Sequence, residues 1–162
     1  MPHARYVIVG DGICRGELET EWRAAGLSDY FRFVGWVEHD SVPDYINLAD
    51  AVVMPSATEA AALVYLETQA CARLIIASDI PGAREIVRDG ETALLFATGD
   101  IGDLTAKLLL AAADPSLRDR IGRASRESVK RYDFGRLVAE YQRLIRGLVE
   151  QPFCGTASAF RE

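Results

Sequence analysis

Two glutamates, Glu59 and Glu67, lie in the segment whose residue types best fit a chemical role. This segment follows an apolar run that ends at Met54, passes through a polar turn, and enters a helix predicted to begin near Ala61. In parallel α/β proteins, ligands bind beside the carboxyl ends of strands, where such turns lie. The free amides at the start of a helix carry partial positive charge, which suits a phosphate. The segment therefore predicts an anion-binding turn with a carboxylate on each side.

Glu67 falls near the centre of an apolar arc when residues 61–72 are projected at about 100° per residue. The arc contains Leu63, Val64, Leu66, Ala70 and Cys71, and the opposite side of the helix carries Tyr65, Thr68, Gln69 and Ala72. An unpaired buried carboxylate is costly, so Glu67 needs hydrogen-bond donors or a counter-charge. The hydroxyls of a bound ribose could be those donors. An ion pair with an arginine, or bonds to backbone amides, are the alternatives that remain open.

Other candidate residues carry weaker signals. Glu59 either faces the same cleft as Glu67 or only stabilises the helix dipole. Gly10 and Gly12 form a turn after the first apolar run, but the spacing to Gly16 does not fit a dinucleotide fingerprint, and a plain tight turn is the alternative. Gly35 could let the backbone approach a flat base.

The apolar runs of the first hundred residues alternate with amphipathic stretches. The runs span residues 5–10, 31–37, 50–55, 74–79 and 92–97, and the predicted helices span residues 15–25, 41–48, 61–71 and 82–88. The runs are β-branched or aromatic and nearly continuous, as in strands buried on both faces. This alternation predicts an α/β fold, a parallel sheet with helices on both faces.

The last third of the chain is predicted to be helical, with three helices that wrap the sheet edge. Their apolar stripes are Leu104, Leu108 and Ala111; Leu117, Ile121 and Ala124; and Leu137, Val138, Tyr141, Leu144 and Leu148. We predict one domain over residues 1–150 and a flexible tail over residues 151–162. The opening residues enter the pattern so early that a first strand-helix unit is apparently missing, although a small complete domain fits the pattern equally well.

Composition narrows the class of protein. The 162 residues include 18 basic and 24 acidic ones, a formal charge of −6 without a basic block, which excludes nucleic acid as a partner and an electrostatic membrane anchor. Three cysteines without paired spacing favour a reducing compartment, and two histidines without ligand spacing predict no metal site. No signal peptide or transmembrane segment is evident. We expect a cytoplasmic protein.

Taken together, the motifs resemble the C-terminal, donor-binding half of the family 4 retaining glycosyltransferases, which have the two-domain GT-B architecture. The resemblance extends from about Ala4 to Leu148 and depends on the order and spacing of several motifs. These are YVIVGDG followed by Leu18-Glu19, FRFVGWV, Val42-Pro43-Asp44-Tyr45, Ala49-Asp50, VVMPSATE, LVYLE, the stretch 70–96, and Arg131-Tyr132-Asp133-Phe134. The resemblance implies a Rossmann-like parallel sheet and a nucleotide-sugar donor, such as a UDP or GDP sugar, with no metal or other cofactor.

The resemblance also implies roles for individual residues. In that family two glutamates separated by seven residues bracket the turn and the helix start, and the matching positions are Glu59 and Glu67. Glu67 is then expected to hold the ribose hydroxyls, and Glu59 to contact the donor sugar as the catalytic residue. The donor-binding set is completed by the glycine turn, by the segment beside the base and by the amides that hold the distal phosphate. These residues are Gly10, Gly12, Gly35, Trp36, Val37, Ala61, Ala62 and Leu63.

Departures from the family pattern affect the same site. Ala61-Ala62 stand where the family usually has Phe-Gly, and Ala72 stands where a glycine ends the helix. Ala83 and Ala93 also replace frequent glycines. The upstream strand, Gly-Arg turn and lysine that neutralise the diphosphate have no match, nor does the N-terminal acceptor domain.

We therefore expect a nucleotide-diphospho-sugar-binding domain of a retaining glycosyltransferase of the hexosyltransferase class that is inactive alone. A subunit completed by a separate acceptor-domain chain, and a non-catalytic nucleotide-binding or scaffolding domain, are the alternatives.

Overall fold

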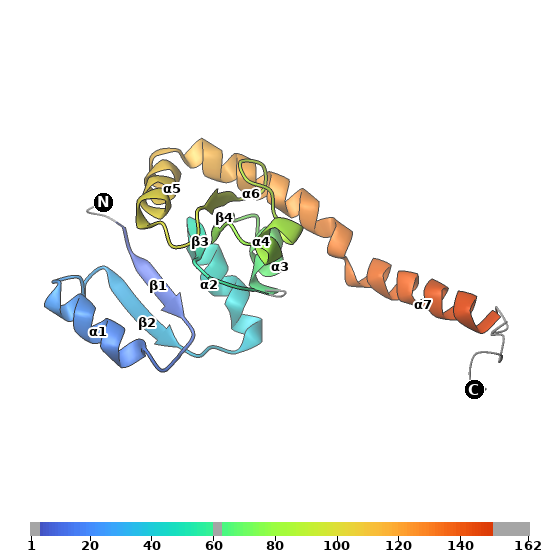
Figure 1. The fold of residues 1–162 in the computed structure, drawn as a ribbon, viewed down its shortest axis with the longest axis horizontal. Helices are drawn as coiled ribbons and strands as arrows, with labels where there is room; N and C mark the ends of the chain where they lie inside the picture. Colours follow the sequence, from blue (N-terminus) through green and yellow to red (C-terminus); the bar gives the residue numbers. More distant parts are fainter. Residues whose placement is uncertain (1–3, 60–62, 151–162) are drawn as a thin grey trace, which may run out of the picture. The chain divides into compact units, whose positions relative to one another are not determined.

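The computed structural model describes residues 4–59 and 63–150, and it divides the chain into two compact units, residues 1–128 and 129–162. Five strands and seven α-helices follow one another in the described parts (Figure 1). The strands are β1 (Tyr6–Val9), β2 (Phe31–Gly35), β3 (Ala51–Met54), β4 (Leu74–Ser78) and β5 (Leu94–Phe96). The helices are α1 (Arg15–Ala24), α2 (Val42–Leu48), α3 (Leu63–Ala70), α4 (Pro81–Ile86), α5 (Ile101–Ala113), α6 (Pro115–Val129) and α7 (Phe134–Glu150). Short 3₁₀ turns occupy His39–Ser41 and Lys130–Tyr132.

The predicted α/β fold with parallel strands is confirmed, but the described strands form two sheets instead of one. β1 pairs with β2, and β3, β4 and β5 form the second sheet in that order, with every pair parallel. In the 3-2-1-4-5-6 order of a doubly wound sheet, β2 and β1 would take positions 3 and 2, and β3 to β5 would take positions 4 to 6. Position 1 has no strand among the described residues. The predicted lack of a first strand-helix unit stays a prediction, as does the domain boundary at residue 150.

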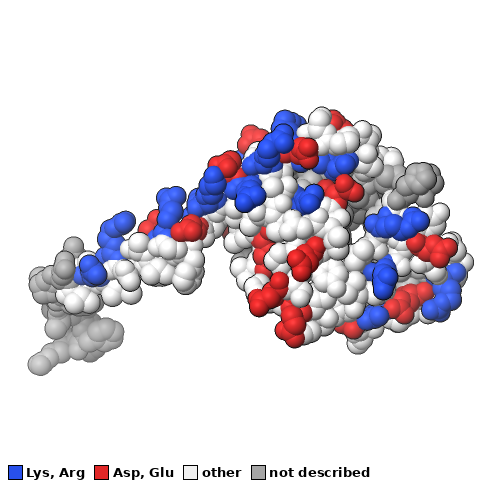
Figure 2. Space-filling model, turned by 180° about the vertical axis from the view of Figure 1, so that it is seen from behind, with Lys and Arg blue, Asp and Glu red and all other residues white. Residues whose placement is uncertain are grey.

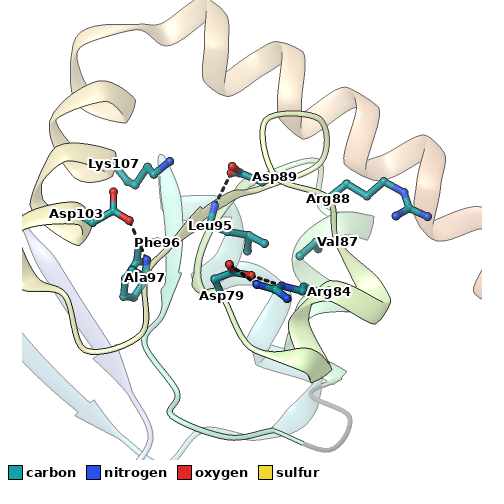
Figure 3. Close-up of a pocket in the computed structure, with 10 residues that line it drawn as sticks. All are labelled: Asp79, Arg84, Val87, Arg88, Asp89, Leu95, Phe96, Ala97, Asp103 and Lys107. Carbon is teal, nitrogen blue, oxygen red and sulfur yellow. Dashed lines mark hydrogen bonds and ion pairs between the residues drawn. The ribbon is translucent and has the colours of Figure 1, made fainter.

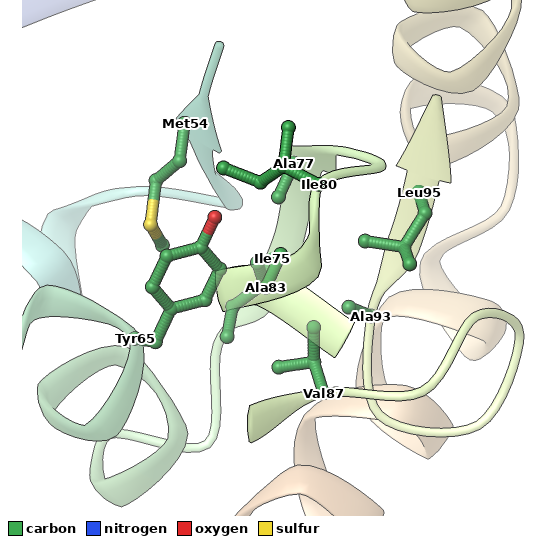
Figure 4. Close-up of a cluster of buried hydrophobic side chains, with 9 residues drawn as sticks. All are labelled: Met54, Tyr65, Ile75, Ala77, Ile80, Ala83, Val87, Ala93 and Leu95. Carbon is green, nitrogen blue, oxygen red and sulfur yellow. The ribbon is translucent and has the colours of Figure 1, made fainter. Parts of the chain in front are cut away.

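The core is built on both faces of β4. Ile75 and Ala77 of β4 join a buried cluster with side chains of α3, α4 and β5, drawn in Figure 4. Leu74 and Ile76 point to a second cluster that contains Phe96, Ala111 and Ile121. Helices therefore cover both faces of this sheet, as the continuous apolar runs predict.

The first sheet differs, because half-buried and exposed residues alternate along β1 and over the first three residues of β2. Trp22 of α1 stacks on Phe31 and Phe33 of β2, with ring centroids 4.2 and 4.8 Å apart. On β1, Val7 and Val9 are 55% and 39% exposed. The expected burial on both faces is wrong for these two strands.

The helical last third is confirmed, with exceptions among its apolar stripes. Leu104, Leu108 and Leu117 pack against the second buried cluster, together with Ala111 and Ile121. Ala124 is exposed and Ser125 takes the buried position one residue later, so the expected stripe is wrong there. The α7 stripe, on the second unit, is exposed apart from the half-buried Val138.

The described surface carries charges of both signs. Figure 2 shows Lys and Arg side chains interspersed with Asp and Glu side chains over one face. Among residues 4–59 and 63–150, no helix is long and apolar enough to cross a bilayer.

Helix α3 ends in a left-handed residue that is not glycine. Ala72 has φ 55°, the one positive φ among the described non-glycine residues. Its amide donates to the carbonyl of Gln69 at 3.0 Å, and the Arg73 amide donates to that of Thr68 at 3.2 Å. This is the hydrogen-bond pattern of a Schellman motif, in which glycine usually takes the left-handed position. The left-handed residue is therefore Ala72, which stands at the position where the family pattern has a glycine.

Replacing Ala72 with glycine should therefore stabilise the domain. Alanine is strained in the left-handed region, and removing its Cβ should raise the free energy of unfolding by about 1 kcal/mol. Denaturant unfolding followed by circular dichroism measures the change. Ala106→Gly, at an exposed position inside α5, is the matched control and should lower the free energy by about 1 kcal/mol. An unchanged or lowered stability of Ala72→Gly would contradict the turn described here.

Candidate functional site

The β3–α3 turn places Glu59 at the carboxyl end of the second sheet. β3 ends at Met54, residues 55–59 follow, and α3 begins at Leu63 in the described structure. The Glu59 carboxylate is half-buried and accepts a hydrogen bond of 2.8 Å from the Ser56 hydroxyl. One oxygen of the carboxylate is therefore positioned by the turn itself. Ala61 and Ala62, predicted to offer their amides to a phosphate, lie outside the described residues.

Glu67 lies farther along α3, and its side chain is 24% exposed. Its Oε1 atom lies 3.6 Å from Nδ1 of His39, a side chain that is itself 77% exposed. Among the described residues, Glu67 makes no ion pair with an arginine, which was one of the alternatives. A contact of this length with an exposed imidazole stabilises the fold little, so the carboxylate keeps capacity to accept hydrogen bonds.

The orientation of α3 differs from the projected one. The buried residues of this helix are Tyr65, Thr68 and Gln69, the side expected to face away from the core. Leu63, expected within the apolar arc, is 65% exposed. The prediction of the buried face is therefore wrong, and Glu67 lies at the margin of the core instead of at its centre.

Three polar side chains lie on the buried face of α3, and they differ in whether they have a hydrogen-bond partner among the described residues. The Thr68 hydroxyl donates to the carbonyl of Val64 at 2.6 Å. The Tyr65 hydroxyl and the Gln69 amide are buried and have no hydrogen-bond partner among the described residues. Burial raises the pKa of the Tyr65 phenol, and the negative charge of Glu59 raises it further. Tyr65 is thus a residue of the Glu59 environment that the sequence pattern did not single out.

The carboxyl ends of β1 and β2 are joined through two glycines. The Gly10 amide donates to the Gly35 carbonyl at 2.7 Å. Both residues have positive φ, 119° at Gly10 and 83° at Gly35. A Cβ on Gly35 would lie 3.3 Å from Nη1 of Arg15, whereas Gly12 has open space around it. The structure therefore brings Gly10 and Gly35 together and gives Gly12 no such contact.

The segment after β2 leads toward α3. Trp36 is 71% exposed and Val37 is half-buried. His39, two residues farther along, contacts Glu67. An exposed indole in the segment that reaches Glu67 offers a flat apolar surface on which a base can stack.

A pocket lies elsewhere and contains none of the predicted site residues. Its volume is about 570 Å³, and its lining includes Asp79, Asp89, Asp103, Arg84 and Lys107 (Figure 3). Each carboxylate is already bound: Asp79 to Arg84, Asp89 to the Leu95 amide, and Asp103 to the Ala97 amide. Hydrogen bonding to Arg84 lowers the pKa of Asp79 and raises that of the arginine. These three carboxylates therefore make contacts within the fold.

No group of three or more potential metal ligands (His, Cys, Asp or Glu) occurs among residues 4–59 and 63–150.

The β3–α3 turn, its flanking glutamates and the parallel sheet agree with one protein family. A family model described as "Glycosyl transferases group 1" matches residues 1–128. The chain belongs to the glycosyl transferases group 1 family. It is 35% identical over 120 residues to alpha-D-kanosaminyltransferase of Streptomyces kanamyceticus, a match that covers 72% of this chain and 30% of the relative. It is 34% identical over 133 residues to 2-deoxystreptamine N-acetyl-D-glucosaminyltransferase of Streptomyces fradiae, covering 75% and 32%.

Solved structures of glycosyltransferases have the same fold as this group 1 domain. Sucrose-phosphate synthase from Thermosynechococcus elongatus superposes with a TM-score of 0.82 at 28% identity, over 89% of this chain and 38% of that one. The C-terminal domain of a Francisella tularensis group 1 glycosyl transferase, LpcC, superposes with a TM-score of 0.74 at 26% identity, over 82% and 72%. The chain thus spans about a third of the full-length curated relatives it matches.

In this group 1 glycosyltransferase domain, Tyr65→Phe should reduce the fall in the free energy of unfolding at alkaline pH. The pKa of Tyr65 is raised in the folded state, so the unfolded chain loses its proton first as the pH rises. The free energy of unfolding should therefore fall as the pH rises past about 10. Phenylalanine removes this dependence and, because the hydroxyl is unpartnered, should cost no stability near neutral pH.

Urea unfolding between neutral and alkaline pH measures the effect. Tyr141→Phe, at a side chain that is 58% exposed, is the matched control and should keep the wild-type profile. A loss of stability in Tyr65→Phe at neutral pH would show that the hydroxyl has a hydrogen-bond partner.

Proposed function

We propose that the chain is the nucleotide-diphospho-sugar-binding domain of a retaining glycosyltransferase. The observation that carries the proposal is the pair of half-buried carboxylates that flank the β3–α3 turn, Glu59 and Glu67. Neither is neutralised by an arginine in the described structure, and each retains capacity to accept hydrogen bonds from sugar hydroxyls. Relatives that match this chain are named as transferases of sugars, which supports the same reading.

The parts of the donor are assigned by the chemistry of each segment. Glu67 accepts hydrogen bonds from the ribose hydroxyls, and Glu59 contacts the sugar beside the reacting carbon. The distal phosphate is assigned to the backbone amides of Leu63, the first residue of α3, and of the two residues that precede it in the sequence, Ala61 and Ala62. The base is assigned to the segment of Gly35, Trp36 and Val37. Gly10 and Gly12 belong to the adjacent turn after β1, in which Gly10 pairs with Gly35.

The donor to test first is UDP-glucose. Anabaena HepE, whose structure matches this chain with a TM-score of 0.80 at 22% identity, was solved in complex with UDP-glucose. We propose that binding requires no metal. Cys14 and Cys71 are free thiols, which supports the proposal that the protein works in the cytoplasm.

The first prediction from this assignment concerns affinity. Calorimetric titration with UDP, GDP, ADP and their glucose conjugates should show binding of at least one pair, unchanged when EDTA is added. Glu67→Ala should weaken that binding by about tenfold or more, since a hydrogen bond to a charged group is lost.

Glu91→Ala, at an exposed residue of the β4–β5 connection, is the matched control and should bind as the wild type does. Absence of binding to every nucleotide in the panel would contradict the proposed function. Equal affinities of Glu67→Ala and the wild type would remove Glu67 from the site.

The second prediction is that the purified chain alone transfers no sugar. Departure of a nucleotide diphosphate needs cations where negative charge develops, and losing one such donor can cost about 3–4 kcal/mol. No matching Gly-Arg turn and lysine occur in the sequence, and the match covers about a third of each relative's length. Donor hydrolysis and transfer assays should give no turnover. Turnover that Glu59→Ala abolishes would contradict this part of the proposal.

A further inference from the structure

Gly82, the second residue of α4, packs directly on the peptide backbone of Glu59. A Cβ placed on Gly82 would lie 2.2 Å from the carbonyl oxygen of Glu59 and 3.1 Å from its carbonyl carbon. These are backbone atoms, so no rotation of a flexible side chain could relieve the contact. Gly82 does not have a left-handed φ, so the position requires glycine for space alone.

The contact joins the proposed site to the buried core. Ala83, the residue after Gly82, is fully buried in the same cluster as Tyr65 and Met54 (Figure 4). Met54 ends β3, immediately before the turn that carries Glu59. Helix α4 is thus anchored in the core through Ala83, while Gly82 in its first turn contacts the backbone of the β3–α3 turn. The Glu59 side chain accepts a hydrogen bond from Ser56, which lies within the same turn.

We propose that Gly82 is a positioning residue that sets where Glu59 stands in the donor site. It acts through the Glu59 peptide and touches no substrate itself. Any side chain at residue 82 must displace the turn or lift α4 from the core. This inference rests on the proposed function, because displacing Glu59 is expected to weaken binding of the sugar part of a nucleotide-sugar donor.

The chain contains a matched control for the same kind of contact. A Cβ on Gly122 of α6 would lie 2.1 Å from the carbonyl oxygen of Ala72 and 2.9 Å from its carbonyl carbon. Gly122 therefore presses on backbone as tightly as Gly82 does, but at the α3–β4 connection and away from Glu59. A general loss of packing should affect both variants, whereas displacement of Glu59 should affect Gly82→Ala alone.

The ligand-free arm of the test compares amide NMR spectra of the wild type, Gly82→Ala and Gly122→Ala. Gly82→Ala should shift the amide signals of residues 56–59, and Gly122→Ala should leave those signals in place. This arm decides the position of the turn even if the wild type binds no nucleotide, an outcome that would overturn only the proposed function. Unshifted amides in Gly82→Ala would overturn the inference. A Gly82→Ala chain that fails to fold would overturn it as well, since glycine would then serve the whole fold.

The binding arm uses UDP and UDP-glucose in calorimetric titrations. In Gly82→Ala the affinity for UDP-glucose should fall about tenfold relative to that for UDP, as expected when one hydrogen bond to a charged group is lost. Gly122→Ala should keep the wild-type ratio. In a Glu59→Gln background, Gly82→Ala should add no further loss, because both changes act on the same contact. Additive losses, or the same change of ratio in Gly122→Ala, would overturn the assignment of Gly82 to Glu59.

Discussion

Burial of β4 on both faces is the constraint on which the rest of the first unit depends. Its five residues are at most 1% exposed, and the first four alternate between two apolar clusters. A strand in this position needs helices on both sides, and α3, α4, α5 and α6 supply the facing residues. Because β3 and β5 pair with β4 in parallel, their carboxyl ends are brought to the same edge of the sheet. The packing of the core therefore sets the position of the β3–α3 turn.

Two contacts position the β3–α3 turn, and both depend on β4. On one side, Met54 of β3 is in register with Ala77 of β4, which fixes the point where the turn leaves the sheet. On the other side, the chain leaves β4 at Ser78 and enters α4, whose glycine lies against the Glu59 peptide. The Glu59 carboxylate, which we propose contacts the donor sugar, is thus positioned by backbone packing, and a hydrogen bond from Ser56 orients it further. Rigid support of this kind reduces the free energy lost on ordering a binding residue.

The sequence predicted the elements better than it predicted their faces. The predicted strands agree with the structure because short β-branched runs bounded by Gly, Pro or Asp are typical of buried strands. The face of α3 was mispredicted because the helix buries Thr68 and Gln69 and exposes Leu63, which reverses the expected pattern. Thr68 tolerates burial through its bond to a carbonyl of its own helix, a local solution that hydropathy does not register. The roles of Tyr65 and Gly82 depend on contacts between elements distant in sequence, which the pattern of residue types along the chain does not show.

The central claim, that a nucleotide-sugar donor binds at the β3–α3 turn, is tested most directly by a crystal structure of the chain with UDP. The account predicts ribose hydroxyls on the Glu67 carboxylate, the diphosphate at the start of α3 and the base beside Trp36. UDP bound instead in the pocket lined by Asp79 and Lys107, with Glu67 still facing only His39, would contradict it.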